Sequence, residues 1–125
     1  MSGLSPEEMS GCLGRPGAGL TMARFDVYAN PQAAERKHTP YLLDVQNDYI
    51  DALPTRIVVP LRREAAFGPR ARNLNPAFII GADNVVLDTA AMGAVPLSEL
   101  RKTVANLRET RAVIQEALDT LFGAY

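Results

Sequence analysis

The sequence has very few of the residues that build disulfides and metal centres. Its 125 residues include one cysteine, Cys12, and one histidine, His38. A single cysteine cannot form an intrachain disulfide, which fits a reducing compartment. A single histidine excludes a multi-histidine metal centre, and no Cys-x-x-Cys motif is present. We therefore expect no metal and no cofactor.

Strong charge of one sign and long apolar runs are also missing. Thirteen basic and fourteen acidic residues give a net charge of −1, whereas proteins that coat nucleic acid usually carry a basic excess. No apolar run reaches the roughly 18 residues that span a bilayer. The polar start, MSGLSPEEMSG, is unlike a secretory signal. We expect a soluble, cytoplasmic protein with no membrane segment and no direct sequence-specific binding of nucleic acid.

The composition allows one domain with a modest core. The chain is 47% hydrophobic over 125 residues, which suits a single small domain. Residues 1–21 differ, because they are rich in glycine, proline and serine and have no hydrophobic period. We expect residues 1–21 to be a disordered extension, upstream of a true start at Met22, and residues 22–125 to form the domain. The alternative is that this extension is a translated, disordered tail.

Five segments have the pattern of β-strands. Phe25 and Val27 alternate with polar neighbours, and the β-branched run at residues 57–59 is typical of a buried strand. The predicted strands are residues 24–28, 41–45, 56–61, 78–80 and 85–87. The last two flank a Gly-Ala-Asp-Asn turn, which predicts a hairpin. Residues 30–40 and 62–75 are expected to be loops, the second with one helical turn at Glu64–Phe67.

The last part of the chain has a helical period. An apolar face recurs at steps of three and four residues, at Leu107, Thr110, Ile114, Ala117 or Leu118, and Leu121. Asn106 and Glu109 have the spacing of a capping box, which predicts the helix start, and Gly123 is placed to end it. Residues 98–105 are expected to be a separate connector.

Strands followed by one helix predict a β-rich α+β fold. We expect a small antiparallel barrel, or a twisted sheet, with the C-terminal helix laid across it. The Ala- and Gly-rich residues 89–95 have small side chains that suit close packing against a strand or a partner.

Several segments occur together in an order and separation that carry a family resemblance. They are Leu43-Asp44-Val45-Gln46-Asn47-Asp48, Ile50-Asp51, residues 56–61, Asn75-Pro76 with Ile80-Gly81, and Met92-Gly93-Ala94-Val95-Pro96. In this pattern the chain resembles the CcdB family of toxins over nearly all of residues 24–125. The resemblance implies an SH3-like barrel with a C-terminal helix, assembled as a two-fold homodimer.

The resemblance also implies a function and partners. Toxins of this family have no catalytic centre, and they bind the gyrase A subunit in its opened state. A ligand selective for one state raises the population of that state, so the DNA-cleaved complex is trapped. The resemblance further implies a labile cognate antitoxin, CcdA-like, whose disordered tail wraps the toxin. We therefore expect a toxin that is not an enzyme.

Position by position, the family's gyrase contacts fall on a loop and on the C-terminus. They correspond to Tyr49 and Ile50, and to Asp119, Phe122, Gly123, Ala124 and Tyr125. The family typically ends in Phe-Trp-Gly-Ile, whereas this chain ends in Phe-Gly-Ala-Tyr and contains no tryptophan. A stacked Arg–aromatic contact contributes about 0.5–2 kcal/mol. Tyr125 could replace part of that contact, and Asp119 adds negative charge where the family often has a neutral amide.

Two other functions remain open at the level of sequence. Ribonuclease toxins share the SH3-like barrel, and an Asp with Arg70 or Arg72 could supply a general base and a phosphorane-stabilising cation. The missing tryptophan motivates the second alternative, a degenerate protein that binds antitoxin but no longer poisons gyrase.

Other polar residues are expected to have structural roles. Asp44, Asp48 and Asp51 are spaced as turn caps rather than as metal ligands. The arginines of residues 62–72 are expected to lie in a solvated loop, or to contact an acidic antitoxin tail. His38 is expected to be an idle surface residue.

Overall fold

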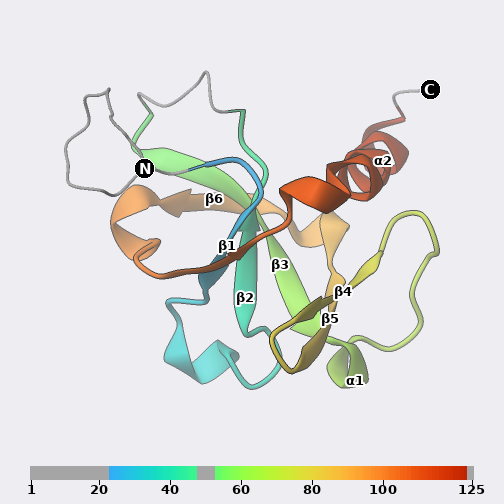
Figure 1. Cartoon of the computed structure of the whole chain (residues 1–125), viewed down its shortest axis with the longest axis horizontal. Helices are drawn as coiled ribbons and strands as arrows, with labels where there is room; N and C mark the ends of the chain where they lie inside the picture. Colours follow the sequence, from blue (N-terminus) through green and yellow to red (C-terminus); the bar gives the residue numbers. More distant parts are fainter. Residues whose placement is uncertain (1–22, 48–52, 124–125) are drawn as a thin grey trace.

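A computed structural model describes residues 23–47 and 53–123 of the chain. Within these residues seven strands form one sheet in the order β4-β5-β3-β2-β1-β7, and β6 pairs with β3 (Figure 1). All pairings are antiparallel. The strands are β1 (Asp26–Ala29), β2 (Tyr41–Asp44), β3 (Thr55–Arg63), β4 (Ala77–Ile80), β5 (Asp83–Leu87), β6 (Gly93–Pro96) and β7 (Thr103–Asn106), and the α-helices are α1 (Glu64–Phe67) and α2 (Arg111–Phe122).

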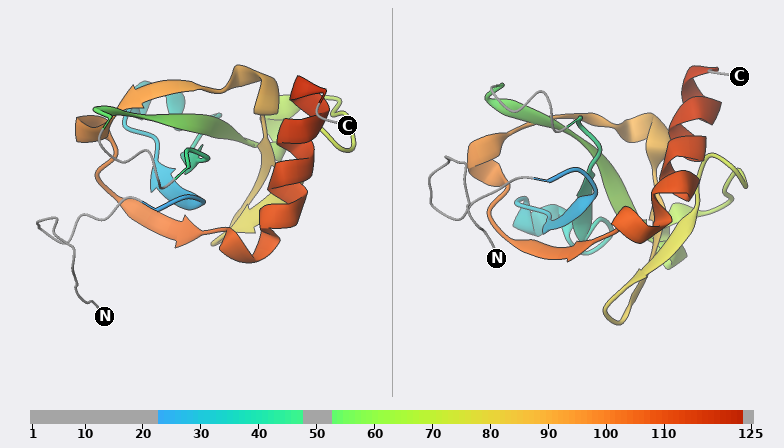
Figure 2. Two further views of the ribbon diagram at one scale, coloured as in Figure 1. Left: turned by 90° about the horizontal axis from the view of Figure 1, so that it is seen from above. Right: turned by 45° about the horizontal axis from the view of Figure 1, so that its top comes forward.

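Strand β3 is the centre of the sheet. Its start pairs with β6, its middle with β2 and its end with β5. Because one nine-residue strand serves three neighbours, the sheet curls into a half-barrel, and α2 lies along one side of it (Figure 2). The predicted fold class, a small antiparallel barrel with a C-terminal helix, is confirmed.

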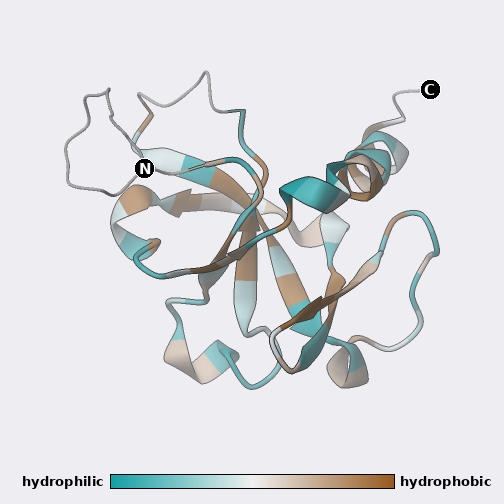
Figure 3. Ribbon diagram, viewed as in Figure 1, coloured by the Kyte–Doolittle hydropathy of each residue, from teal (hydrophilic) through white to brown (hydrophobic). Residues whose placement is uncertain are grey.

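Alternating residues of the strands face two different cores. In β3, Val59 and Leu61 face the larger core, whereas Val58 belongs to a smaller cluster on the opposite face. The alternation follows from the two-residue period of a strand, and Figure 3 shows apolar residues in the middle of β3 and hydrophilic ones at its two ends. Helix α2 covers the larger core with Ile114, Ala117 and Leu118. The predicted buried face is confirmed for these residues, whereas Leu107 and Thr110 precede the helix.

The C-terminal end of α2 is as predicted, but its start is not. Gly123 has a φ of +68° and donates its N–H to the Asp119 carbonyl, which is the geometry of a glycine cap. The helix begins at Arg111, after a 3-10 turn. Asn106 accepts the Arg108 N–H at 2.8 Å, so its side chain supports that 3-10 turn rather than the α-helix. The predicted capping box is therefore wrong.

The expectation of five strands is also wrong. Strands β6 and β7 were missed, since their sequences GAVP and TVAN each contain only one large apolar residue, Val95 or Val104, and they form by pairing with β3 and β1. The connector at residues 98–105 is separate from α2, as expected, but it begins in a 3-10 turn (Leu97–Glu99) and ends in β7. The first strand starts at Asp26 rather than Arg24, because Phe25 has a φ of +73° that interrupts the extended backbone.

The loop predicted at residues 62–75 begins later than expected, because β3 continues to Arg63. Arg62 and Arg63 belong to β3 and contact Asp88 and Asp83, so the solvated-loop interpretation fails for these two residues. The helical turn at Glu64–Phe67 is confirmed.

No helix in the described ranges is long and apolar enough to cross a membrane. The extension predicted at residues 1–21 lies outside the described residues.

Candidate functional site

The last turn of α2 exposes an aromatic side chain. Phe122 is 68% exposed, although Leu118, one turn earlier, is buried, and Leu121 is half-buried. This end of the helix projects from the molecule (Figure 1). A large apolar side chain held in water at a projecting end contributes little to folding, and such exposure is typical of binding surfaces.

A negative charge lies beside Phe122. Asp119 is three residues earlier, so the two side chains share one side of the helix. One Asp119 carboxylate oxygen accepts a hydrogen bond from Gln115 Nε2 at 3.0 Å. The turn that presents the pair is closed by the Gly123 cap. Asp119, Phe122 and Gly123 thus form one surface, which we call the α2 end surface.

The remaining predicted contact residues are Tyr49, Ile50, Ala124 and Tyr125, and all four lie outside the described residues. The structure does describe the two ends of the chain segment that carries Tyr49 and Ile50. It leaves the sheet after Asp44 and returns to it at Thr55. Polar contacts between these two ends therefore define the base of the loop.

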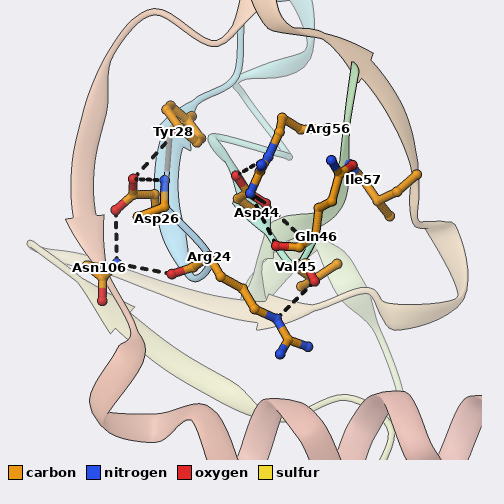
Figure 4. A network of polar contacts seen from close by, with 10 residues as sticks. Arg24, Asp26, Tyr28, Asp44, Val45, Gln46, Arg56, Ile57 and Asn106 are labelled. Carbon is orange, nitrogen blue, oxygen red and sulfur yellow. Dashed lines mark hydrogen bonds and ion pairs between the residues drawn. The ribbon is translucent and has the colours of Figure 1, made fainter. Parts of the chain in front are cut away.

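A buried ion pair lies at the base of this loop. Arg56 donates to both carboxylate oxygens of Asp44, with Nε–Oδ2 at 2.8 Å and Nη2–Oδ1 at 3.0 Å. The side chains are 2% and 0% exposed, respectively, and Figure 4 shows them inside the curled sheet. Burial raises the pKa of Asp44, and the hydrogen bonds from Arg56 oppose this rise. The loss of one partner of such a buried pair is strongly destabilising, because it leaves an uncompensated charge.

Gln46 extends the network across the loop base. Its N–H donates to Asp44 at 3.0 Å and its carbonyl accepts from Arg56 at 3.2 Å. Its side-chain oxygen accepts the Ile57 N–H at 3.0 Å. Asp44 therefore caps the turn, as predicted, but its partnership with Arg56 was missed. The signal available in the sequence was a charged residue at the start of an apolar strand.

A second set of polar contacts joins the loop base to α2, and Figure 4 shows the one between Arg24 and Val45. Arg24 donates from Nε to the Val45 carbonyl at 3.0 Å and from Nη2 to Gln115 Oε1 at 3.3 Å. Gln115 in turn contacts Asp119 of the α2 end surface. A continuous chain of hydrogen bonds thus connects the two regions that hold the predicted gyrase contacts.

Asp26 and Tyr28 complete the polar interior. Asp26 accepts hydrogen bonds from the Ala23 N–H at 3.0 Å and from Asn106 Nδ2 at 2.9 Å. Burial, followed by the charge of Asp26, raises the pKa of Tyr28. A phenol with a raised pKa stays protonated at neutral pH, so Tyr28 is a hydrogen-bond donor there rather than a base.

The residues named for the ribonuclease alternative do not meet a carboxylate in the structure. Arg70 donates to the Asn75 carbonyl at 2.8 Å, and Arg72 is exposed. In the described part of the chain, neither arginine forms an ion pair. No cluster of three or more His, Cys, Asp or Glu side chains suited to a metal ion occurs among those residues. His38 is exposed, and it lines a surface hollow of about 420 Å³.

A known protein family matches most of the chain. The family model described as "CcdB protein" matches residues 24–123. This range covers all seven strands and both α-helices of the structure. The chain therefore belongs to the CcdB family, the gyrase-targeting toxins of toxin–antitoxin systems.

Proposed function

We propose that this protein binds the gyrase A subunit, traps the DNA-cleaved complex and is neutralised by a cognate CcdA-like antitoxin. The observation that supports the proposal is the 68% exposure of Phe122 at the end of α2, in a chain that belongs to the CcdB family. The protein acts by binding alone. It supplies no catalytic group to the DNA, because gyrase itself cleaves the strands.

Phe122 takes the role of the aromatic anchor in this proposal. Interface energy is concentrated in a few aromatic and Arg residues, and without a tryptophan the chain must use Phe122 or Tyr125. The glycine cap at Gly123 holds the end of α2 in a fixed direction. A dimer presents two copies of this surface to the two-fold symmetric gyrase A subunits. Binding that is tighter to the cleaved state raises its population.

The test is a DNA-cleavage assay with the cognate gyrase and supercoiled plasmid. The native protein should increase linear DNA after denaturation of the gyrase. Phe122→Ala should weaken this effect about tenfold or more, as expected for loss of an aromatic hot spot. Val113→Ala is the matched control, because Val113 is an exposed apolar residue of the same helix, at 43% exposure. It should retain the native potency.

Three results would contradict the proposal. If Phe122→Ala and Val113→Ala behave like the native protein, Phe122 is not the anchor. If expression stops growth without cleaved DNA, the target is not the gyrase cleavage complex. If the purified protein cleaves RNA at specific sequences, the protein is an enzyme.

The absence of tryptophan favours one second candidate, a protein that retains antitoxin binding without poisoning gyrase. This alternative predicts tight binding to the antitoxin, no growth arrest and no cleaved DNA.

A further inference from the structure

The surface hollow of about 420 Å³ that His38 lines has two walls from distant parts of the chain. One wall is the loop that contains the 3-10 turn Ala33–Glu35, and the other is the segment around the 3-10 turn Thr89–Ala91. Leu42 of β2 and Pro60 of β3, which pair in the sheet, also line it. Small-molecule sites in proteins have volumes of about 300–1,000 Å³, so the size of this hollow suits a small ligand. We call it the β2–β3 hollow.

Part of the lining is apolar and fixed in place. Leu42 is 7% exposed and belongs to the smaller apolar cluster of the sheet. Pro60, Ala34 and Ala91 add further aliphatic surface. This part of the hollow can bury an aliphatic group of a ligand, which is favourable in proportion to the apolar area removed from water.

Hydrogen bonds hold both walls of the hollow. Asn30, 2% exposed, donates from Nδ2 to the Thr39 carbonyl at 2.8 Å, and its side-chain oxygen accepts the Gln32 N–H at 2.9 Å. In the other wall the Asp88 N–H donates to the Pro60 carbonyl at 2.9 Å. The hollow is therefore formed before a ligand enters, so that binding needs little ordering of the chain.

Arg62 has unused hydrogen-bonding capacity in the lining. Its side chain is 39% exposed, and its contact with Asp88 joins Nη1 to Oδ2 at 3.5 Å, which is longer than a charge-assisted hydrogen bond. Its Nε is buried and has no partner. Among the residues that the structure describes, the Arg62 side chain makes no hydrogen bond. Its exposed terminal nitrogens are thus available to a carboxylate, which arginine binds through parallel hydrogen bonds.

Two carboxylates line the same hollow, one from each wall. Glu35 is exposed in the 3-10 turn after β1, and Asp88, 18% exposed, follows β5. Within the described ranges neither carboxylate accepts a hydrogen bond, and the loose contact with Arg62 is the one ion pair between them. Both are available to an ammonium group, so the hollow presents charges of both signs beside apolar surface.

We propose that the β2–β3 hollow binds a small zwitterion with an aliphatic body, a ligand of the α-amino acid class. The carboxylate of the ligand pairs with Arg62, and its ammonium group pairs with Glu35 and Asp88. Its aliphatic body covers Leu42 and Pro60. This arrangement uses the donors of Arg62 and the two carboxylates, which the fold leaves without hydrogen bonds.

Ligands with charge of one sign fit the hollow less well. A simple anion that approaches Arg62 meets the carboxylates of Glu35 and Asp88, and a simple cation that approaches these carboxylates meets Arg62. Like charges brought together in an interface oppose binding. A metal ion also fits poorly, because the described residues contain no cluster of three or more His, Cys, Asp or Glu side chains suited to one.

The β2–β3 hollow is separate from the α2 end surface, so the inference goes beyond the proposed function. No residue of α2 is part of its lining. The turn Ala33–Glu35 and the C-terminal end of α2 lie on opposite sides of Figure 1. Substitutions in the hollow should leave the gyrase assay unchanged, so failure of one proposal does not imply failure of the other.

The test titrates the isotope-labelled full chain with L-leucine and follows the backbone amide chemical shifts by NMR. Leucinamide, which lacks the carboxylate, and isocaproate, which lacks the ammonium group, are the comparison ligands. L-leucine should shift the amides of Glu35 and Asp88 in a saturable way. It should bind about fivefold more tightly than either comparison ligand, because each of these loses one charge contact.

Two variants assign the charges of the ligand to the two sides of the hollow. Arg62→Gln should remove the preference for L-leucine over leucinamide, since the partner of the carboxylate is gone. Glu35→Gln should reduce the preference for L-leucine over isocaproate. Glu35 lies exposed in a short turn, so this variant tests the proposal even if Arg62→Gln does not fold.

Glu64→Gln is the matched control, because Glu64 is an exposed acidic residue at the start of α1 that does not line the hollow. It should retain the native affinity and both preferences. The proposal is overturned if L-leucine does not shift these amides, if either comparison ligand binds as tightly as L-leucine, or if Arg62→Gln and Glu35→Gln both keep the native preferences. Equal effects of Glu35→Gln and Glu64→Gln would also overturn it.

Discussion

At the scale of single residues, the buried pair of Asp44 and Arg56 is the strongest constraint on the site. It holds the two ends of the loop that carries Tyr49 and Ile50. Removing one partner of a buried pair leaves an uncompensated charge, which costs more than the intact pair contributes. The two substitutions should therefore be strongly non-additive.

We expect Arg56→Met to lower the free energy of unfolding by about 3–5 kcal/mol at neutral pH. Asp44→Leu/Arg56→Met should lose much less, because no buried charge remains. Urea denaturation monitored by circular dichroism measures both values. A double variant as unstable as the sum of its single variants would mean that the two side chains have no coupling energy, which would contradict the prediction.

The same variant has a pH dependence of known sign. Burial raises the pKa of Asp44, so the native state holds that proton more tightly than the unfolded state. The associated stability is present below the unfolded pKa, near 3.8, and is lost as the pH rises through the folded pKa. Arg56→Met removes the opposing contact. Its destabilisation should therefore be smaller at about pH 4 than at pH 7, and an equal loss at both pH values would contradict the assignment.

The stability that depends on Asp83 should change with pH in the opposite direction. Its lowered pKa gives stability that is present above the unfolded value, near 3.8, and is lost as the pH falls through the folded pKa. Asp83→Asn should remove this contribution, which is below about 1 kcal/mol for a partly exposed pair. Tyr41→Phe should reproduce part of the effect, since the Tyr41 hydroxyl is the largest cause of the shift. Identical acid-unfolding curves for the native protein and both variants would contradict this.

At the scale of elements, the cap of α2 determines how Phe122 is presented. Gly123 has a φ of +68°, which an L side chain adopts only with strain. A Cβ at this position would meet no atom within 4 Å, so any cost of Gly123→Ala comes from the backbone alone.

We expect Gly123→Ala to destabilise the protein by about 1 kcal/mol and to increase amide exchange in the last turn of α2. Helix propensity alone predicts the reverse, because alanine favours helices over glycine. A higher melting temperature for Gly123→Ala would therefore show that the cap does not hold the end of the helix.

The strands also show which elements local sequence patterns predict and which they do not. Strands β2, β3, β4 and β5 were predicted within two residues, because each carries its own run of β-branched or apolar residues. Strands β6 and β7 were not, since pairing with distant strands makes them extended. In β7, for example, Asn106 pairs with Asp26, far earlier in the chain.

At the scale of the whole molecule, assembly decides how many copies of the α2 end surface one particle presents. The resemblance implies a two-fold homodimer, and this stays a prediction. We expect sedimentation equilibrium to give twice the chain mass of 13.5 kDa. A monomer at micromolar concentration would contradict this prediction, and it would leave the gyrase proposal with one anchor for each bound protein.

The sequence by itself determined the fold class, the buried face of α2 and its glycine end, because these follow from local periodicity and backbone preference. It also determined the family, because several motifs occur in the family's order and spacing. Only the tertiary structure showed that Asp44 meets Arg56, that Phe122 faces solvent and that Glu35, Arg62 and Asp88 line one hollow. The reason is that burial and charge contacts depend on which distant strands become neighbours. Sequence spacing does not contain that information.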